Sequence, residues 1–122
     1  MCPLRSGVDL VEVKRMGLLQ ESIRSRFLER VFTSAELEYA RGSDIHLAGR
    51  FAAKEAVAKA LGSGIGPVSW QEIEILNNPG GEPVLYLHGN AKKMAEDLGL
   101  QQWSVSISHT TEYAVAIAVA SA

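Results

Sequence analysis

Two carboxylates lie where an apolar side chain would be expected. Asp9 falls in the middle of the strand-like stretch GVDLVEV (residues 7–13), and Glu55 falls inside the apolar arc of a helix-like stretch. A carboxylate on a buried face is costly unless a cation pairs with it or it binds a metal ion. Both kinds of partner are open for Asp9 and Glu55.

The neighbours of Glu55 supply one partner without any function. Lys59 stands one helical turn later, so an i,i+4 ion pair worth about 0.3–0.5 kcal/mol would account for Glu55. The alternative is a shared metal ion. Since the chain has one cysteine and three histidines, two carboxylates suit a hard cation with oxygen ligands, and so Mg²⁺ more than Zn²⁺.

Basic side chains near Glu55 point to phosphate chemistry at such a site. Mg²⁺ held by one or two carboxylates completes its shell with water and substrate phosphate oxygens. Arg50, Lys54 and Lys59 could neutralise further phosphate charge. His109 ends a strand-like stretch, where a histidine is either structural or catalytic. The glycines at 62, 64 and 66 follow a helix, and their spacing is not that of a phosphate-binding loop.

These residues must be positioned by elements that the local pattern predicts. A buried strand is expected over residues 7–13. Residues 14–32 are expected to form one helix, with a buried stripe of Met16, Leu19, Ile23, Phe27 and Val31. Thr33 and Glu36 form a capping-box pattern for a short helix ending before Gly42. Ser43 caps a central helix over about residues 44–61, which ends at Gly62.

The second half of the chain predicts two hairpins separated by a helix. Strands are expected at 70–76 and 84–87, joined by a turn at 77–81. Asn90 should cap a helix that ends at Gly99, and strands at 103–108 and 114–120 follow. The predicted fold is α+β, with a mostly antiparallel sheet packed against a long central helix in a single domain over residues 1–122.

Composition limits the classes of partner. The chain has 122 residues and a net charge of -2, so no global basic field indicates nucleic acid. No apolar run is long enough for a membrane span, and we expect no signal peptide. The single cysteine fits a reducing, cytoplasmic compartment. Basic residues of one early segment would suit an acidic partner: Lys14, Arg15, Arg24, Arg26 and Arg30.

Three blocks resemble the holo-acyl-carrier-protein synthase type of 4′-phosphopantetheinyl transferase. They are GVDLVEVKR near the start, GRFAAKEAVAKALGSGIG in the middle and SVSISHTTEYAVAIAVA at the end. WQEIEI and the G-x-P-x-L segment at residues 81–85 also match. The resemblance covers nearly the whole chain at the family's short length, and the middle block is its most specific part.

The resemblance implies an activity and a set of site residues. The family moves 4′-phosphopantetheine from coenzyme A to a serine of an apo acyl carrier protein, with Mg²⁺, and releases adenosine 3′,5′-bisphosphate. Asp9 and Glu55 match its metal ligands. The implied catalytic residues are Glu55, Lys59 and His109, with Glu55 or a metal-held water as the base. The cofactor-binding set expected from the matching blocks is Arg50, Lys54, Lys59, Gly62, Gly64 and His109.

The resemblance also implies partners. The short members are trimers with active sites at subunit interfaces, and their basic first helix docks the acidic carrier, which gives Arg15 and Arg24 a docking role. Three other readings stay open from the residues: a coenzyme A-binding module without transfer, a Mg²⁺-dependent hydrolase of nucleotide pyrophosphates, and a structural domain in which Asp9 and Glu55 only pair with Lys or Arg.

Overall fold

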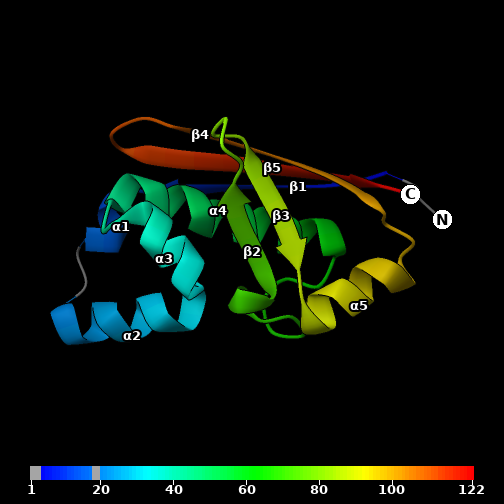
Figure 1. Cartoon of the computed structure of the whole chain (residues 1–122), viewed down its shortest axis with the longest axis horizontal. Helices are drawn as coiled ribbons and strands as arrows, with labels where there is room; N and C mark the ends of the chain where they lie inside the picture. Colours follow the sequence, from blue (N-terminus) through cyan, green and yellow to red (C-terminus); the bar gives the residue numbers. More distant parts are fainter. Residues whose placement is uncertain (1–3, 18–19) are drawn as a thin grey trace.

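The chain folds around one long helix laid across a three-stranded antiparallel sheet. The computed structural model describes residues 4–17 and 20–122. The sheet has the order β1 (Leu4–Glu12), β5 (Tyr113–Ser121), β4 (Gln102–His109). The helix α4 (Asp44–Leu61) covers one face of this sheet. Figure 1 shows the sheet nearly edge-on, with the helices gathered on one side of it.

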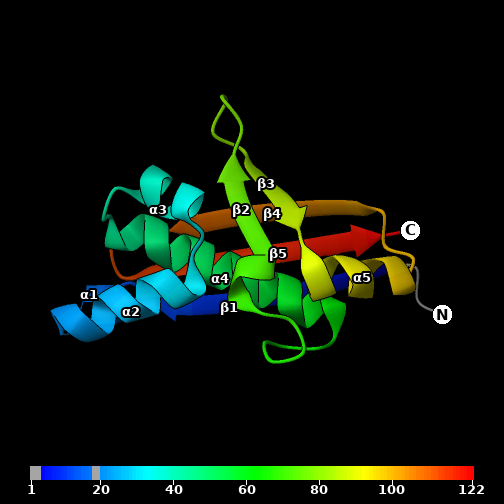
Figure 2. The ribbon, with the colours of Figure 1, turned by 60° about the horizontal axis from the view of Figure 1, so that its bottom comes forward.

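The remaining elements pack around α4 and against the β4 edge of the sheet. They are α1 (Lys14–Gly17), α2 (Glu21–Val31), α3 (Ser34–Ala40), the 3-10 turn η1 (Trp70–Glu72), the hairpin β2 (Ile73–Asn77) and β3 (Pro83–Leu87), and α5 (Gly89–Asp97). The hairpin forms a second, two-stranded antiparallel sheet whose turn projects from the body of the molecule (Figure 2). The predicted α+β class, with antiparallel strands against a central helix, is confirmed.

Small residues let α4 lie close to the sheet. Alanines of β5 at 114, 116, 118 and 120 are buried against α4, whose own buried residues include the alanines at 48, 52, 56 and 60. Gly7 of β1 lies so close to α4 that a β-carbon there would clash with the backbone of Ala56 and Ala60. The absence of a side chain at Gly7 therefore fixes the distance between β1 and α4, and with it the position of Asp9 two residues later.

Local capping signals are confirmed. The Thr33 hydroxyl accepts the Glu36 amide at 3.2 Å, and the Glu36 carboxylate accepts the Thr33 amide at 2.8 Å. The Ser43 hydroxyl accepts the His46 amide at 3.3 Å at the start of α4. Gly62 ends α4 in the left-handed conformation with φ 81°. Each of these contacts joins residues within a few positions of one another, which is why the sequence pattern predicts them.

The single helix predicted for residues 14–32 is wrong. The chain forms α1 up to Gly17 and starts α2 at Glu21, with Leu19 outside the described residues. In a continuous helix the Met16 carbonyl would accept the amide of residue 20; here it accepts Arg24 Nε at 3.1 Å. Met16 and Val31 are buried as predicted, Phe27 is half-buried, and Ile23 is exposed.

Two boundaries in the second half also differ from the prediction. Residues 70–72 form the turn η1 instead of the start of a strand. The predicted cap Asn90 lies inside α5, and its amide donates to the Glu72 carboxylate at 2.6 Å. Glu72 also accepts the Ser69 amide at 2.7 Å, so one side chain from a distant segment replaces the local cap.

The strand at residues 7–13 is buried on one face only. Val11 is buried toward α4, whereas Val8 and Leu10 are 55% and 62% exposed on the opposite face. On the same outer face of β5, Tyr113, Val115 and Ile117 are also exposed. The outer face of the sheet therefore exposes apolar residues along β1 and β5, whereas the exposed residues of β4 on this face are Gln102, Ser104, Ser106 and Ser108.

Candidate active site

Asp9, Glu55 and Lys59 meet between β1 and α4. The Lys59 ammonium donates to the Asp9 carboxylate at 3.1 Å and to the Val8 carbonyl oxygen at 2.9 Å. Asp9 faces α4 because it shares a strand face with Gly7 and Val11. Lys59 reaches the strand from the last turn of the helix. The expected juxtaposition of the residues at 9, 55 and 59 is present in the structure.

The i,i+4 ion pair between Glu55 and Lys59 does not form. Lys59 pairs with Asp9 instead, so an ion pair with a lysine accounts for Asp9 but not for Glu55. The Glu55 side chain makes no hydrogen bond or ion pair with the residues that the structure describes. Burial, followed by the negative charge of Asp9, raises the pKa of Glu55, and the Lys59 charge acts in the opposite direction.

This donor set fits a divalent cation. Two carboxylates close enough to raise a pKa, one of them unpaired, are relieved by a positive ion placed between them. Within residues 4–17 and 20–122, no group of three His, Cys, Asp or Glu side chains is placed to hold a metal. The protein would therefore contribute two oxygen ligands, which suits Mg²⁺ with water and phosphate oxygens in its remaining positions.

The structure removes Lys54 from the predicted cofactor-binding residues. Its ammonium is fully buried and contacts Glu36 at 2.7 Å, the Ile73 carbonyl at 2.5 Å and the Trp70 carbonyl at 3.0 Å. Burial lowers the pKa of Lys54, and Glu36 opposes that shift. The prediction that Lys54 neutralises phosphate charge is wrong, because its three donors already hold α4 against α3 and η1.

Arg50 also lies on a side of α4 that faces away from Asp9 and Glu55. Its guanidinium is buried over the Tyr39 ring, 4.2 Å from the centroid, and donates to the Asn77 side chain. Burial lowers the pKa of Arg50, while Tyr39 and Glu36 raise it. Arg50 therefore faces the hairpin instead of β1, and its predicted contact with the cofactor is not supported.

Gly62 and Gly64 lie just beyond the end of α4, whose last turn carries Lys59. Gly62 donates its amide to the last turn of the helix, and both glycines have positive φ, 81° and 63°. Arg5 Nε donates to the Ala60 carbonyl at 2.6 Å in the same region. The conformation of this turn explains both glycines, and their contact with a cofactor stays a prediction.

His109 lies apart from the carboxylates within one chain. Asp9 pairs with Ala116 of β5, which pairs with Ile107 of β4, so β5 separates His109 from β1. His109 ends β4 two residues beyond Ile107, and its side chain is exposed. No hydrogen bond or ion pair joins the His109 side chain to another described residue.

Comparison with known proteins decides the family. Residues 5–118 match the family described as the 4′-phosphopantetheinyl transferase superfamily. The chain belongs to this superfamily. It is 46% identical over 117 residues to a holo-[acyl-carrier-protein] synthase of Caldanaerobacter subterraneus, covering 93% of this chain and 91% of that protein. A second relative with the same description, from Herpetosiphon aurantiacus, is 46% identical over 123 residues, covering 95% and 97%.

Solved structures of the same transferases share the fold. The holo-[acyl-carrier-protein] synthase of Helicobacter pylori, solved in complex with coenzyme A, has a TM-score of 0.86 at 33% identity, covering 95% of this chain and 99% of that chain. The enzyme from Neisseria meningitidis has a TM-score of 0.86 at 35% identity, covering 97% and 98%. The resemblance stated from the sequence blocks is thereby confirmed.

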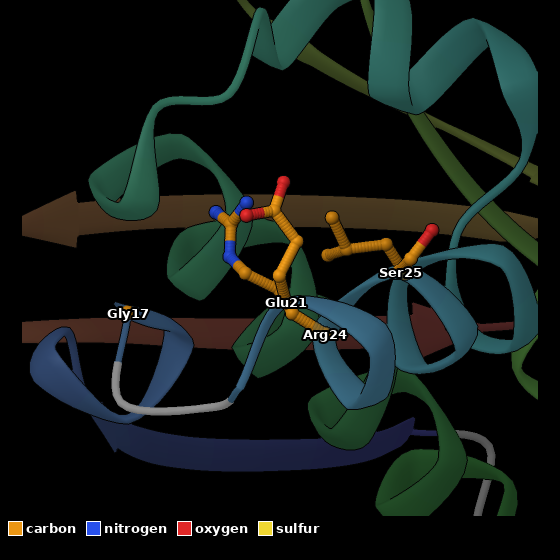
Figure 3. Close-up of a pocket in the computed structure, with 5 residues that line it drawn as sticks. Gly17, Glu21, Arg24 and Ser25 are labelled. Carbon is orange, nitrogen blue, oxygen red and sulfur yellow. The ribbon is translucent and has the colours of Figure 1, made fainter.

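Two arginines were predicted to dock a carrier in this phosphopantetheinyl transferase. Of these two, only Arg15 is not engaged in an ion pair within the described residues. Arg24 forms an ion pair with Asp44 at 2.7 Å and donates to the Met16 carbonyl. Figure 3 shows Arg24 and Glu21 pointing from α2 toward the hollow beside Gly17. Arg24 is thus a tie between α1, α2 and α4, whereas the exposed Arg15 keeps its charge available.

Sequence reasoning missed the residues that hold this site in place. Glu36, Glu72 and Glu74 appear in the sequence as a cap and two strand residues, yet each carries a contact between distant segments. Glu36 and Glu72 each follow a Thr or Ser by three residues, which is a local capping-box signal, and only the one at Glu36 was predicted. No helix in the described part of this transferase is both long and apolar enough to cross a bilayer.

Proposed function

We propose that this chain transfers 4′-phosphopantetheine from coenzyme A to a serine hydroxyl of an apo acyl carrier protein. The observation that carries the proposal is the meeting of Asp9 and Glu55, two carboxylates 46 positions apart in sequence, in a phosphopantetheinyl transferase fold. In the reaction the serine oxygen bonds to the phosphorus that bears pantetheine. The bond from this phosphorus to adenosine 3′,5′-bisphosphate breaks, and the serine proton leaves.

Each residue of the site would have its own role in this transfer. Asp9 and Glu55 would hold Mg²⁺, which when bound neutralises charge on the pyrophosphate oxygens. Glu55, or a water held by the metal ion, is our candidate acceptor for the serine proton. Lys59, half-exposed at the same place, would hold a phosphate oxygen. His109 would assist at the leaving group.

We further propose that the chain acts as a homotrimer with its active sites at subunit interfaces. The exposed apolar residues of the outer sheet face support self-association, because such a patch is unusual on a monomer. The separation of His109 from Asp9 within one chain supports a site completed by a neighbouring copy. The number three follows the family resemblance.

Carrier docking would rest on exposed positive charge on α1 and α2. Arg15, Arg26 and Arg30 are exposed on α1 and α2, and an acidic carrier would be attracted to them. Arg24 contributes indirectly by fixing α2 against α4. We propose a coenzyme A donor and an apo acyl carrier protein acceptor; neither nucleic acid nor a membrane enters the reaction.

Incubation with coenzyme A, Mg²⁺ and a panel of apo carrier proteins tests the function, with intact mass as the readout. The expected result is a carrier heavier by one phosphopantetheine, dependent on both coenzyme A and Mg²⁺. Cleavage of coenzyme A without a carrier would indicate the pyrophosphate hydrolase. Binding of coenzyme A with no modified carrier anywhere in the panel would indicate the binding module and would refute the transferase.

A further inference from the structure

Lys59 forms an ion pair with Asp9, a carboxylate that the proposed function assigns to a metal ion. Its ammonium lies 3.1 Å from Asp9 Oδ1 and 2.9 Å from the Val8 carbonyl oxygen. The Lys59 side chain is 51% exposed and that of Asp9 is 18% exposed. No other cation is paired with Asp9 in the part of the chain that the structure describes. The ammonium and a divalent ion would therefore compete for the same oxygen.

The two lysines of the AKEAVAK segment differ in their freedom to move. Lys54 is fully buried and bound to three acceptors, so its ammonium cannot leave without exposing Glu36 as an unpaired buried charge. Lys59 has one charged partner and a half-exposed stem. Its flexible side chain can swing off Asp9 while the helix stays in place. Lys59 is thus a mobile counter-ion, and Lys54 a fixed one.

An anion bound at the end of α4 would be the next acceptor for Lys59. Lys59 stands in the last turn of this helix, where the carbonyl ends carry partial negative charge and disfavour an anionic ligand. A pyrophosphate bound near Asp9 and Glu55 would need a positive group at this end. The Lys59 ammonium is within reach of that position and is the basic residue of the last turn.

We propose that Lys59 couples donor binding to metal binding by exchanging partners. The ammonium competes with the divalent ion for Asp9, and the pyrophosphate of coenzyme A draws it away, so that donor and metal strengthen each other's binding through this one side chain. The proposal rests on the proposed function, because it takes Asp9 and Glu55 as the metal ligands. Lys59 acts here as a positioning residue before any chemistry occurs.

Binding of Mn²⁺ as a probe for Mg²⁺, measured by the paramagnetic signal of the free ion, tests the exchange. Titrations are run with and without coenzyme A and in the absence of a carrier, so that no turnover takes place. Without coenzyme A, Lys59→Gln should bind Mn²⁺ about five- to tenfold more tightly than the wild type, because a nearby unit charge no longer repels and competes with the ion. Lys59→Arg, which keeps the charge, should stay near the wild type.

The second readout is the coupling between coenzyme A binding and Mn²⁺ binding. The factor by which coenzyme A tightens Mn²⁺ binding should be several-fold smaller in Lys59→Gln than in the wild type, and the reciprocal factor for coenzyme A should shrink equally. Lys92→Gln, an exposed lysine on α5, makes the same change in net charge away from the site and should match the wild type. Where Mn²⁺ alone binds too weakly to measure, coenzyme A affinity with and without Mn²⁺ gives the same factor.

The outcomes separate the two proposals. If Lys59→Gln and Lys92→Gln have the same Mn²⁺ affinity and the same coupling factor as the wild type, the exchange is overturned while the metal site stands. If Asp9→Asn binds Mn²⁺ as tightly as the wild type in the presence of coenzyme A, the metal assignment fails, and the exchange fails with it. Thermal unfolding of each variant verifies that the fold is kept.

Discussion

The contact between Gly7 and α4 gives the sharpest prediction for the whole site. A β-carbon at Gly7 would lie 2.9 Å from the Ala60 amide nitrogen and 3.0 Å from the Ala56 carbonyl carbon, whereas ordinary contacts begin at 3.4 Å. These atoms belong to a helix backbone and cannot rotate away. In Gly7→Ala, β1 must therefore move from α4 by at least about 0.5 Å, the difference between 2.9 and 3.4 Å, and by more to clear the Ala56 carbonyl oxygen, which lies nearer still.

The shift should affect both stability and chemistry. Overpacking of this kind costs about 1–3 kcal/mol, and the backbone contacts place Gly7→Ala at the upper end of that range. For a domain of this size, about 3 kcal/mol lowers Tm by roughly 10–15 °C. Because Asp9 follows Gly7 on the same strand face, turnover by the molecules that remain folded should also fall, by about tenfold or more.

Thermal unfolding and intact-mass turnover measure the two effects separately. Ser6→Ala is the matched control, since Ser6 precedes Gly7 on the same strand and is exposed on the opposite face. We expect Ser6→Ala to behave as the wild type. A Gly7→Ala variant with Tm within about 2 °C of that control would refute the close approach of β1 to α4 and the dependence of Asp9 on it.

The remaining predictions concern charge. Asp9→Asn and Glu55→Gln should fold normally, lose most turnover and need more Mg²⁺, and the double variant should be little worse than the worse single one; near-normal turnover in either single variant would contradict a shared ion. The Michaelis constant for the carrier should rise with salt and in Arg15→Glu, and no change in either comparison would contradict electrostatic docking. Burial raises the pKa of Glu74, but hydrogen bonds from Thr33 and His88 bring it below its usual value, so its stabilising effect is present above the unfolded pKa and is lost as pH falls through the folded one. Urea unfolding between pH 7 and about pH 3 should show a smaller loss of stability in Glu74→Gln than in the wild type, and parallel losses would contradict the shift.

Local signals predicted helix ends well, and distant contacts explain the errors. The caps at Thr33, Ser43 and Gly62 depend on residues within a few positions, and all three are present. The break after Gly17 depends on Arg24, which reaches back to Met16 and across to α4, and no helical periodicity reveals such a tie. The pattern therefore predicted one helix where the structure has two.

The candidate site shows the same limit at the level of single side chains. Helical spacing placed Glu55 and Lys59 one turn apart, but it could not show that β1 brings a second carboxylate to Lys59. It also could not distinguish Lys54 from Lys59, since burial of Lys54 depends on Glu36 and β2. Residue types alone suggested a Mg²⁺ ion shared by Asp9 and Glu55, the resemblance to a transferase family supported that prediction, and the fold brings the two carboxylates together.

The pairing of β1 with β5 has a consequence for synthesis of the chain. In the described structure β1 has one strand partner, and that partner is the last strand, Tyr113–Ser121. On the ribosome, the strand that carries Asp9 must wait until residues 113–121 have emerged before it can pair. Closure of so long a loop is slow, and until then Val11 and Val13, which are buried in the folded structure, stay accessible to chaperones. A nascent chain that ends before residue 113 thus carries Asp9 on an unpaired strand, and the two carboxylates proposed to bind a metal lack the sheet that fixes one of them.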